Sequence, residues 1–544
     1  MTAALSLLGG LSDNITIDPL KCTFCGICVE RCILDNLRLK LAPCRRECPL
    51  HTNCQGYVQL IARGDDKKAM SVLAEVLPFV GIIGRVCHHP CESACTRREV
   101  DGEAVAIRDL KRYLADHVDL PPVVVSPERQ QSVGIVGAGP AGAMAAFCLR
   151  KQGFQVEVYD ANQRAGGMLA VGVPEFRLPV NVLDAEMGVL SNMGVAVHLG
   201  VRVGADLPLA RLLETHDAVL LATGVHVSQR LGVEGEDLSG VQGGLEFLSA
   251  ARGTNKPTVG RRVIVIGGGN TAVDVAQTAR RLGAEDVSLV CLEAPAEMPA
   301  FAWEVEDARD EGVQFVNRWG PVRFVASDGS VSAVELRRCV AVFDGEGRFA
   351  PSYNEAERLT VDADTVVVAI GQRTDLSFVG ELPIPVAGGR IMAAADTLQC
   401  QDGASQASLS KVFAAGDVVT GPKTVVDALA SGREAAESIR RFLDGDDLRY
   451  GRSYLGPCDL EFEVDKSKAL PRRRTAMPKT DLTDRRSFSQ LEKGFSAQQA
   501  RKEAERCLSC GLPYGKFRTC WFCLPCEVDC PEEALHVEIP YLLR

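Results

Sequence analysis

Short apolar runs that end in glycines recur through the middle of the chain, and each is followed by a stretch with helical character. The run Val133–Val136 leads into Gly137-Ala-Gly139-Pro-Ala141-Gly142, then an alanine-rich segment, and a second apolar run ends at Asp160. A buried strand, a glycine turn, a helix and a second strand in this order are typical of a βαβ unit. The pattern therefore predicts an α/β fold with a parallel sheet.

The glycines of this unit have separate roles in binding a dinucleotide. Gly137 permits the tight turn, Gly139 lets backbone approach a pyrophosphate, and Gly142 lets the helix pack closely on the strand. The helix N-terminus, with Ala141 in its first turn, then faces the negative phosphates. Asp160 stands 18 residues after Gly142, where its carboxylate accepts from ribose hydroxyls. We therefore predict a dinucleotide site here.

A second copy of the pattern begins at Arg262. The small and polar residues of its turn are Gly267, Gly269, Asn270, Thr271 and Ala272. Glu293 follows its second strand, where a carboxylate repels a 2′-phosphate and suits a free ribose diol. Two copies predict one FAD and one nicotinamide, and Glu293 favours NAD(H) over NADP(H). A solvated glutamate at a strand end is the alternative interpretation.

Two later segments indicate which copy holds FAD. Thr365–Gly371 is an apolar run that ends in glycine, and Val412–Asp417 is another that ends in Gly416-Asp417. This order resembles the two-dinucleotide flavoprotein disulfide reductases, in which the nicotinamide unit is inserted into the FAD domain. The resemblance implies that Gly416 and Asp417 close on the ribityl and phosphate region of FAD. It also implies that a helix from Thr424 points its N-terminus toward the flavin.

Cysteine is the unusual component of the composition. Of 21 cysteines, ten lie between Cys22 and Cys95, six lie between Cys507 and Cys530, and five are scattered without a CxxC pair. In a large chain without an export signal, clustered thiols indicate metal sites rather than disulfides. A net charge of −11 argues against nucleic-acid binding, and no apolar run spans a bilayer. We expect a cytoplasmic protein.

Two cysteine runs share the spacing C-x2-C-x2-C-x3-C. They consist of Cys22, Cys25, Cys28 and Cys32, and of Cys520, Cys523, Cys526 and Cys530. This is the run of bacterial ferredoxins, in which three thiolates hold one [4Fe–4S] cluster and the fourth reaches the other cluster. Zinc ribbons instead separate two CxxC pairs by a longer loop. The runs therefore predict ferredoxin-type clusters at both ends of the chain.

A third group contains Cys44, Cys48, Cys54, Cys87, Cys91 and Cys95. With Val105–Lys111, Gly166–Pro174, Arg177 and Gly267–Asp274, it resembles the small (β) subunit of glutamate synthase and its relatives over residues 43–445. The resemblance implies a helical domain with two [4Fe–4S] clusters near the flavin, and cofactor contacts from Gly166, Gly167 and Arg177.

The chain departs from that family in two places. The family has a CxxC before the position of Cys44, whereas residues 36–41 contain no cysteine. We expect Cys507 and Cys510 of the C-terminal tail to replace it. Some relatives use a non-cysteine ligand near the position of Lys111, which cannot serve here, and Cys54 is the natural substitute.

The sixteen cysteines of the end regions suffice for four cubanes. The two helical sets are predicted as Cys44, Cys95, Cys507 and Cys510 (first) and Cys48, Cys54, Cys87 and Cys91 (second). The two ferredoxin-type sets are predicted as Cys22, Cys25, Cys28 and Cys530 (first) and Cys32, Cys520, Cys523 and Cys526 (second). The alternative is that each run closes its own cluster and leaves Cys507 and Cys510 spare.

The predicted domains follow from these patterns. They are an N-terminal ferredoxin-type half (1–40), a helical iron–sulfur domain (41–129), the FAD domain in two parts (130–258 and 362–450), an NAD domain (259–361), and a linker with a C-terminal ferredoxin-type segment (451–544). The predicted fold class is α/β, with two Rossmann-type domains, a small α-helical iron–sulfur domain and a ferredoxin-like terminal unit.

These features predict a flavoprotein that exchanges hydride between NAD(H) and FAD and relays single electrons through [4Fe–4S] clusters. Its expected partners are ferredoxin or the other subunits of a redox complex, such as a 2-oxoacid:ferredoxin oxidoreductase, a formate dehydrogenase, a hydrogenase or an aromatic-acyl-CoA reductase system. The alternatives are an NADPH-dependent glutamate synthase small subunit, a flavin-based bifurcating subunit, and an electron-transfer module without nicotinamide turnover.

Overall fold

The computed structural model describes residues 15–18, 20–33, 36–253, 256–380, 382–400, 410–452, 457–467, 469–515, 520 and 522–539. The chain divides into two compact units. The terminal unit comprises residues 1–123, 449–478 and 494–544, and the central unit comprises 124–448 and 479–493. Within the described residues, no helix combines the length and apolarity that a membrane crossing requires.

The central unit contains a first five-stranded parallel sheet in the order β19-β6-β3-β4-β5. Its strands are β3 (Ser132–Val136), β4 (Gln155–Asp160), β5 (Ala196–Leu199), β6 (Ala218–Leu221) and β19 (Val412–Ala414). Its helices are α10 (Pro140–Lys151), α11 (Met168–Val171), α12 (Val180–Asn192), α13 (Leu209–Thr215), α17 (Asp417–Thr420) and α18 (Val425–Asp444). Every residue of β6 is buried, as expected for a parallel strand covered on both faces.

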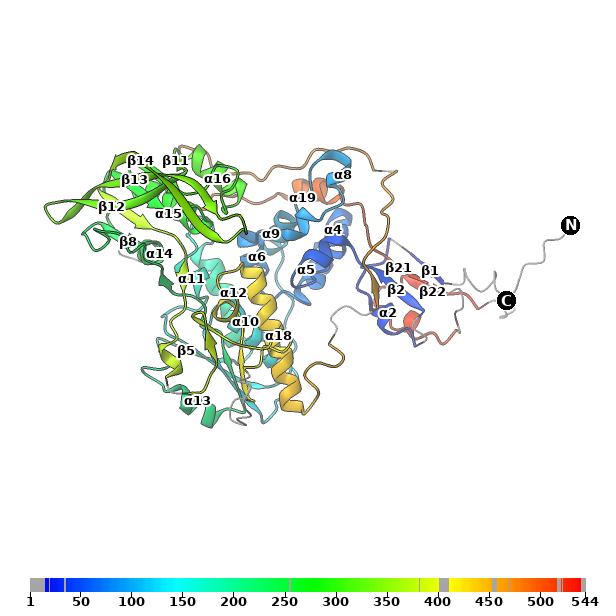
Figure 1. The fold of residues 1–544 in the computed structure, drawn as a ribbon. Coiled ribbons are helices and arrows are strands. Elements are labelled where there is room, and N and C mark those ends of the chain that lie inside the picture. The colour runs from blue at the N-terminus through cyan, green and yellow to red at the C-terminus, as the bar shows by residue number, and fades with distance from the viewer. Residues whose placement is uncertain are drawn as a thin grey trace. The chain divides into compact units, whose positions relative to one another are not determined.

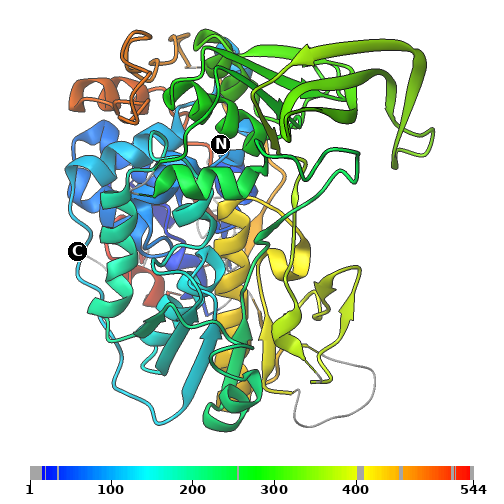
Figure 2. The same cartoon turned by 90° about the vertical axis from the view of Figure 1, so that its left-hand side faces the viewer.

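Helices α10 and α18 lie side by side against this sheet (Figures 1 and 2). A β-carbon added to Gly432 of α18 would stand 2.1 Å from the carbonyl oxygen of Ala141 in α10. Only glycine fits at that crossing, so α18 is held directly against α10, the helix that follows the first glycine turn.

A second five-stranded parallel sheet has the order β11-β10-β9-β15-β8. Its strands are β8 (Val241–Gly243), β9 (Arg262–Ile266), β10 (Asp286–Cys291), β11 (Gln314–Asn317) and β15 (Thr365–Val368). Its helices are α14 (Gly244–Arg252), α15 (Asn270–Arg281) and α16 (Ala302–Asp310), and an antiparallel sheet follows with β12 (Trp319–Ser327), β13 (Ser330–Phe343) and β14 (Phe349–Asp362). The two parallel sheets confirm the predicted fold class.

Sheet membership differs from the predicted domain boundaries at two strands. β8 lies before residue 259 and β15 lies after residue 361, yet both belong to the second sheet, with β15 hydrogen-bonded between β9 and β8. The segment Lys479–Lys493, predicted as part of the C-terminal linker, belongs to the central unit. There Leu491 donates its backbone N–H to the carbonyl of Phe176 at 2.9 Å.

Four short strands and one 3-10 helix complete the description of the central unit. The strands β7 (Val227–Ser228) and β16 (Gln372–Arg373) form an antiparallel pair, as do β17 (Val386–Ala387) and β18 (Arg390–Ile391). A short 3-10 helix, η1, spans Ser377–Val379. Ser377 and Phe378 of η1 line the cavity beside the first sheet that is described below.

The terminal unit joins the two ends of the chain in antiparallel pairs. β1 (Ile15–Ile17) pairs with β22 (Leu535–Val537), and β2 (Leu37–Lys40) pairs with β21 (Pro513–Gly515) and in parallel with β20 (Cys458–Asp459), as Figure 1 shows for the labelled strands. Its helices are α2 (Ile27–Glu30), α3 (Pro43–Glu47), α4 (Cys54–Arg63), α5 (Asp66–Ala74), α6 (Val80–Val86), α7 (Pro90–Ser93), α8 (Arg98–Asp101), α9 (Ile107–His117), α19 (Ala497–Ala504) and α20 (Pro525–Val528). Sequence segments more than 470 residues apart thus form one folded region.

Candidate functional site

The first glycine turn leads from β3 into α10 with little free space. Gly137 has φ 108°, and an added β-carbon would stand 2.3 Å from the carbonyl oxygen of Ala222. At Gly142 the added atom would stand 1.9 Å from the carbonyl oxygen of Gly137. Gly139 differs, because its nearest neighbour would be the Cα of Gly167 at 3.8 Å. The protein therefore requires glycine at two positions, while Gly139 leaves space for a ligand.

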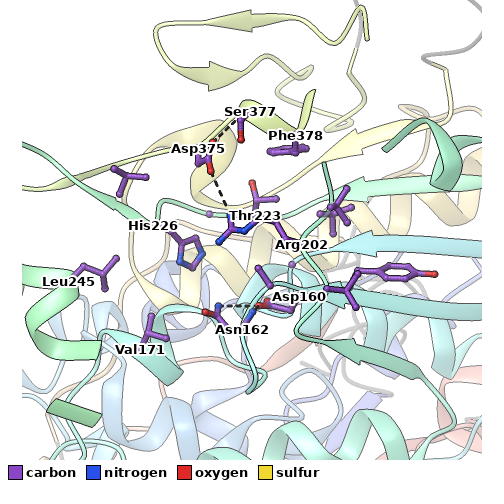
Figure 3. Close-up of a pocket in the computed structure, with 18 of the residues that line it drawn as sticks. Asp160, Asn162, Val171, Arg202, Thr223, His226, Leu245, Asp375, Ser377 and Phe378 are labelled. Atoms are coloured by element: carbon purple, nitrogen blue, oxygen red, sulfur yellow. Dashed lines mark hydrogen bonds and ion pairs between the residues drawn. The ribbon is translucent and has the colours of Figure 1, made fainter. Parts of the chain in front are cut away.

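Asp160 lies at the end of β4 and is 7% exposed. Its carboxylate accepts from the backbone N–H of Ala138 at 2.7 Å and from that of Asn162 at 2.8 Å (Figure 3). The carboxylate thus holds the glycine turn and borders a cavity of about 340 Å³. A cavity of this size is within the range of cofactor sites.

The same cavity includes side chains that sequence reasoning missed. Arg202 and Asp375 form an ion pair at 3.7 Å across it, and Thr223 and His226 follow β6 (Figure 3). Burial lowers the pKa of His226, so the imidazole is held neutral. A weak signal for this wall was present, because the buried run Ala218–Leu221 is followed by Ala-Thr-Gly.

Gly166 and Gly167 lie against the first turn. Gly166 donates its N–H to the carbonyl of Ala138 at 2.9 Å, and a β-carbon on Gly167 would stand 2.8 Å from the Cα of Gly139. Both have positive φ, 122° and 54°, which favours glycine. They are therefore placed beside the predicted pyrophosphate position.

Arg177 contacts two carboxylates of the second dinucleotide fold, although the family resemblance implied a cofactor contact. Its guanidinium donates to both carboxylate oxygens of Asp274, at 2.8 and 2.9 Å, and to Glu304 at 2.5 Å. Asp274 is on α15 and Glu304 is on α16, so this ion pair joins the segment after the first turn to the second dinucleotide fold. Arg177 is not among the residues that line the cavity.

The Gly416-Asp417 pair follows β19 and borders the first turn. A β-carbon on Gly416 would stand 3.0 Å from the β-carbon of Ala141. Asp417 accepts from the backbone N–H of Lys423 at 3.2 Å, and burial raises the pKa of its carboxyl to about 6. Thr424 caps α18 by accepting from the N–H of Asp427. The predicted helix therefore begins at the expected residue, with its N-terminus beside Gly416-Asp417.

The second glycine turn repeats the backbone of the first. Gly267 has φ 139°, and an added β-carbon would stand 2.2 Å from the carbonyl oxygen of Ala369. A β-carbon on Gly269 would meet nothing within 4 Å. The side chain of Asn270 accepts from the N–H of Phe301 at 2.8 Å and fixes the following loop. Thr271 and the buried Ala272 continue into α15.

Glu293 lies beside this turn, two residues beyond β10. Its carboxylate would stand 2.6 Å from a β-carbon added to Gly268, so it lies directly on the glycine-rich backbone. Its backbone carbonyl accepts from Asn317 and from the N–H of Arg318, both at 3.2 Å. Glu293, Arg318 and Arg338 all act electrostatically on the buried thiol of Cys339, so charges of both signs gather here.

Both ferredoxin-type runs adopt the same backbone conformation. Phe24 and Phe522 have positive φ of 58°, and each donates its N–H to the sulfur two residues earlier, on Cys22 at 3.3 Å and on Cys520 at 3.4 Å. The fourth cysteines also accept backbone N–H bonds, Cys32 from Asn36 at 3.1 Å and Cys530 from Ala534 at 3.3 Å. Backbone N–H donors favour the charged thiolate form that a cluster requires.

The two ends of the chain bring these thiols together in crossed groups. One cavity is lined by Cys22, Cys25, Cys28 and Cys530. The thiol of Cys526 interacts electrostatically with Cys32, Cys520 and Cys523, and burial raises its pKa to about 11. The grouping is that of the two predicted ferredoxin-type sets, and Cys523 is the exposed member.

The helical cysteines also gather with the C-terminal pair. A second cavity is lined by Cys44, Cys54, Cys95, Cys507 and Cys510. Cys54 exchanges side-chain hydrogen bonds with both Cys44 and Cys91, so it lies between the two helical sets. Cys87 has Cys91 and Cys48 as its electrostatic neighbours. The donor chemistry, four thiols for each set, fits [4Fe–4S] clusters.

None of the described His, Cys, Asp and Glu side chains forms a group of three or more arranged to hold a single metal ion. All 21 cysteines are free thiols. The N-terminal cysteine run and the C-terminal CxxC therefore contribute to these sets without any disulfide.

Lys111 was expected to have no ligand role, and the structure gives it an unusual environment. It lies on α9 and is 3% exposed. Burial lowers the pKa of its ammonium, but Cys87, Cys91, Cys48 and Cys54 outweigh burial and the net pKa is raised. Its charge thus faces all four thiols of the second helical set.

Comparison with protein families gives two matches. Residues 131–432 match the pyridine nucleotide-disulphide oxidoreductase model, and residues 22–120 match the model described as dihydropyrimidine dehydrogenase domain II, 4Fe-4S cluster. The first match spans both predicted dinucleotide folds, and the second covers most of the predicted helical iron–sulfur domain together with the Cys22–Cys32 run of the predicted N-terminal ferredoxin-type half.

Individual proteins are similar over longer stretches. The NADP(+)-dependent formate dehydrogenase subunit beta of Moorella thermoacetica is 36% identical over 508 residues, which covers 86% of this chain and 70% of that protein. The glutamate synthase [NADPH] small chain of Azospirillum brasilense is 32% identical over 418 residues, 73% of this chain and 86% of that one. The solved structure of FprA, a Mycobacterium tuberculosis oxidoreductase, shares the fold at 20% identity, with a TM-score of 0.51 over 58% of this chain and 85% of that chain.

Proposed function

We propose that this chain, which belongs to the pyridine nucleotide-disulphide oxidoreductase family, exchanges hydride between a nicotinamide and FAD and relays single electrons through four [4Fe–4S] clusters. Within that family it is one of the FAD- and NAD(P)-dependent iron–sulfur oxidoreductases that include the glutamate synthase small chain. FAD, when bound, supplies the conversion between two-electron and one-electron transfer.

The observation that carries the proposal is the crossing of the chain ends. β1 pairs with β22 and β2 with β21, and the cavities beside them are lined by thiols from both ends. A protein that only bound two dinucleotides would have no use for sixteen thiols in four groups. The arrangement within the terminal unit supports a path for single electrons through the thiol sets.

The two dinucleotides are assigned to the two glycine turns. The first turn, with Asp160, the Gly166-Gly167 loop and Gly416-Asp417 around it, is proposed to hold FAD. The second turn, with Gly269 and Glu293, is proposed to hold the nicotinamide. The carboxylate of Glu293 favours NAD(H) by repelling a 2′-phosphate.

Two observations favour NADP(H) instead. The relatives are named for NADP(+) and NADPH, and Arg318 and Arg338 lie near Glu293 around Cys339. Steady-state kcat/KM values with NADH and NADPH decide between the two forms. A higher value with NADH would support the role given to Glu293. A higher value with NADPH would indicate that Arg318 and Arg338 bind the 2′-phosphate at the adenosine end.

The membership of the first helical set is tested by replacing Cys507 and Cys510 together with alanine. Because these two thiols line the same cavity as Cys44 and Cys95, we expect the loss of about four irons per chain, the content of one cubane. The control is Cys148→Ala, which removes a single cysteine of α10 in the central unit. Full iron content in the double variant would mean that each run closes its own cluster.

Partner subunits are proposed from the names of the relatives, a subunit beta and a small chain. This chain would then be the nicotinamide-reacting subunit of a redox complex, such as a 2-oxoacid:ferredoxin oxidoreductase or a formate dehydrogenase. A glutamate synthase small subunit is a second candidate, favoured by 32% identity to such a chain. The two candidates are separated by identifying the polypeptides that copurify with the tagged native protein. Only a glutamate synthase small subunit would copurify with a large glutamine-binding subunit.

The activity itself is tested by anaerobic titration of the purified protein with NADH and, separately, NADPH. Bleaching of the flavin absorbance by either nucleotide is the expected result. A flavin that stays oxidised with both nucleotides would favour an electron-transfer module without nicotinamide turnover.

A further inference from the structure

Lys111 is a buried cation in the core of the terminal unit. It projects from α9, is 3% exposed, and interacts electrostatically with the four thiols of the second helical set, Cys48, Cys54, Cys87 and Cys91. Helix α9 packs directly on α6, which is followed by Cys87, because a β-carbon added to Gly84 of α6 would stand 2.7 Å from the Cα of Arg112, the residue after Lys111. The lysine and this set therefore share one electrostatic environment.

The neighbouring cations on α9 are neutralised by carboxylates, whereas Lys111 is not. Arg108 pairs with Asp109 at 2.9 Å, and Arg112 pairs with Asp116 at 3.2 Å. Among the residues that the structure describes, no carboxylate forms an ion pair with Lys111. A buried charge destabilises the fold unless another charge offsets it. The thiols are the groups in position to offset it.

The first helical set has a different surrounding field. Arg97 acts on Cys507 of this set but forms an ion pair with Asp101 at 2.7 Å and donates to the backbone carbonyl of Arg506 at 3.2 Å. Arg45 acts on one thiol of each helical set, Cys44 and Cys54, so it does not distinguish the two sets. The cation that acts on the first set and not on the second is therefore compensated within the protein.

We propose that Lys111 is the charge partner of the cluster held by the second helical set and raises the reduction potential of that cluster above that of its neighbour. The proposal rests on the proposed function of these cysteines as cluster ligands. A cubane with four thiolates carries net negative charge, and reduction adds one more electron. A fixed positive charge nearby stabilises the reduced form more than the oxidised form, and a low dielectric strengthens this effect.

The test is a redox titration of the anaerobically purified protein, followed by EPR, on two variants of Lys111. Lys111→Gln removes the charge at similar length, and Lys111→Arg retains the charge. We expect the glutamine variant to raise the oxidised-to-reduced ratio of one cluster about tenfold at a fixed potential, which is about 59 mV for a one-electron couple. The arginine variant and Lys67→Gln, which replaces an exposed lysine of α5, should leave all potentials unchanged.

Iron analysis accompanies each titration and separates the outcomes. Unchanged potentials in Lys111→Gln with full iron content would overturn the proposal, as would loss of the cluster in both variants. Loss of about four irons in Lys111→Gln with retention in Lys111→Arg would support it, because only the charge differs. A native protein without iron at the second helical set would contradict the proposed function itself.

Discussion

The two glycine turns of the central unit have nearly the same backbone but differ in how their acidic residue is used. Gly137 and Gly267 both have positive φ, and Gly139 and Gly269 both begin a helix with extended backbone. Asp160, however, is buried and accepts from the backbone of its own turn, whereas Glu293 is half-buried, lies against Gly268 of its turn and accepts a side-chain hydrogen bond from the thiol of Cys291. The shared backbone indicates the same ligand class, and the acids indicate different modes of binding.

The third small residue of each turn extends this difference. A β-carbon at Gly142 would stand 1.9 Å from a backbone oxygen, while the second turn accommodates the β-carbon of Ala272. Helix α10 therefore approaches its strand more closely than α15 does. The first turn is tightly built around a buried carboxylate and a cavity, as suits a resident cofactor, and the second is more open, as suits a dinucleotide that binds and leaves.

Breaking the link between the two folds should have the largest effect. Arg177→Met removes the cation that Asp274 and Glu304 share, and removing one partner of a buried ion pair costs about 3–5 kcal/mol. Thermal unfolding should show a large fall in the transition of the central unit. The matched control Arg177→Met with Asp274→Asn and Glu304→Gln should recover part of the loss. A single variant as stable as the native protein would show that the ion pair is dispensable.

The tight packing of the first turn is tested by Gly142→Ala. The added methyl must displace backbone, so we expect a destabilisation of about 1–3 kcal/mol together with loss of bound FAD. The matched change in the second turn, Ala272→Gly, should cost about 1 kcal/mol and leave the FAD content unchanged. Equal FAD loss in both variants would erase the distinction between the turns. Thermal unfolding and the flavin-to-protein ratio measure both quantities.

The assignment of ligands is tested by Gly139→Ala and Gly269→Ala. Neither added methyl comes closer than 3.8 Å to the protein, so both variants should fold and any defect reports on the ligand. Gly139→Ala should lower the flavin-to-protein ratio. Gly269→Ala should retain FAD and raise the KM for the nicotinamide about tenfold, equivalent to about 1.4 kcal/mol. A reversed pattern would exchange the two assignments.

The smallest expected effect comes from the acid of the second turn. Glu293→Ser removes the carboxylate that we propose faces the ribose, and the ratio of kcat/KM for NADPH to that for NADH should rise about tenfold. Glu297→Ser, which removes another carboxylate of the same loop, serves as the control. An unchanged ratio in Glu293→Ser would mean that the carboxylate does not select the nucleotide.

The sequence predicted the parts of the molecule that local chemistry determines. The spacing of Gly137, Gly142 and Gly267 predicts positions where the backbone leaves no room for a side chain. The spacing of the cysteine runs likewise predicts ligands of [4Fe–4S] clusters. The resemblance to the glutamate synthase small subunit, and the two Rossmann-type sheets, are confirmed. The cluster membership of each cysteine stays a prediction, although the structure gathers the thiols in the expected groups.

Features that depend on packing between distant segments were not predictable in the same way. β15 is a short apolar run like β19, and nothing in either run specifies which sheet it joins. Arg202, Thr223, His226 and Asp375 form one cavity wall only because separate loops converge there. Arg177 carried a family signal, but its partners Asp274 and Glu304 become visible only in the folded chain.

We propose that electrons pass from the nicotinamide through the flavin to clusters built by both ends of the chain. Rapid anaerobic mixing of the iron-replete protein with NADH or NADPH, followed by flavin absorbance and by EPR of frozen samples, tests this proposal directly. We expect the flavin to bleach first and signals of reduced [4Fe–4S] clusters to follow in the same sample. A flavin that bleaches while every cluster remains oxidised would contradict it.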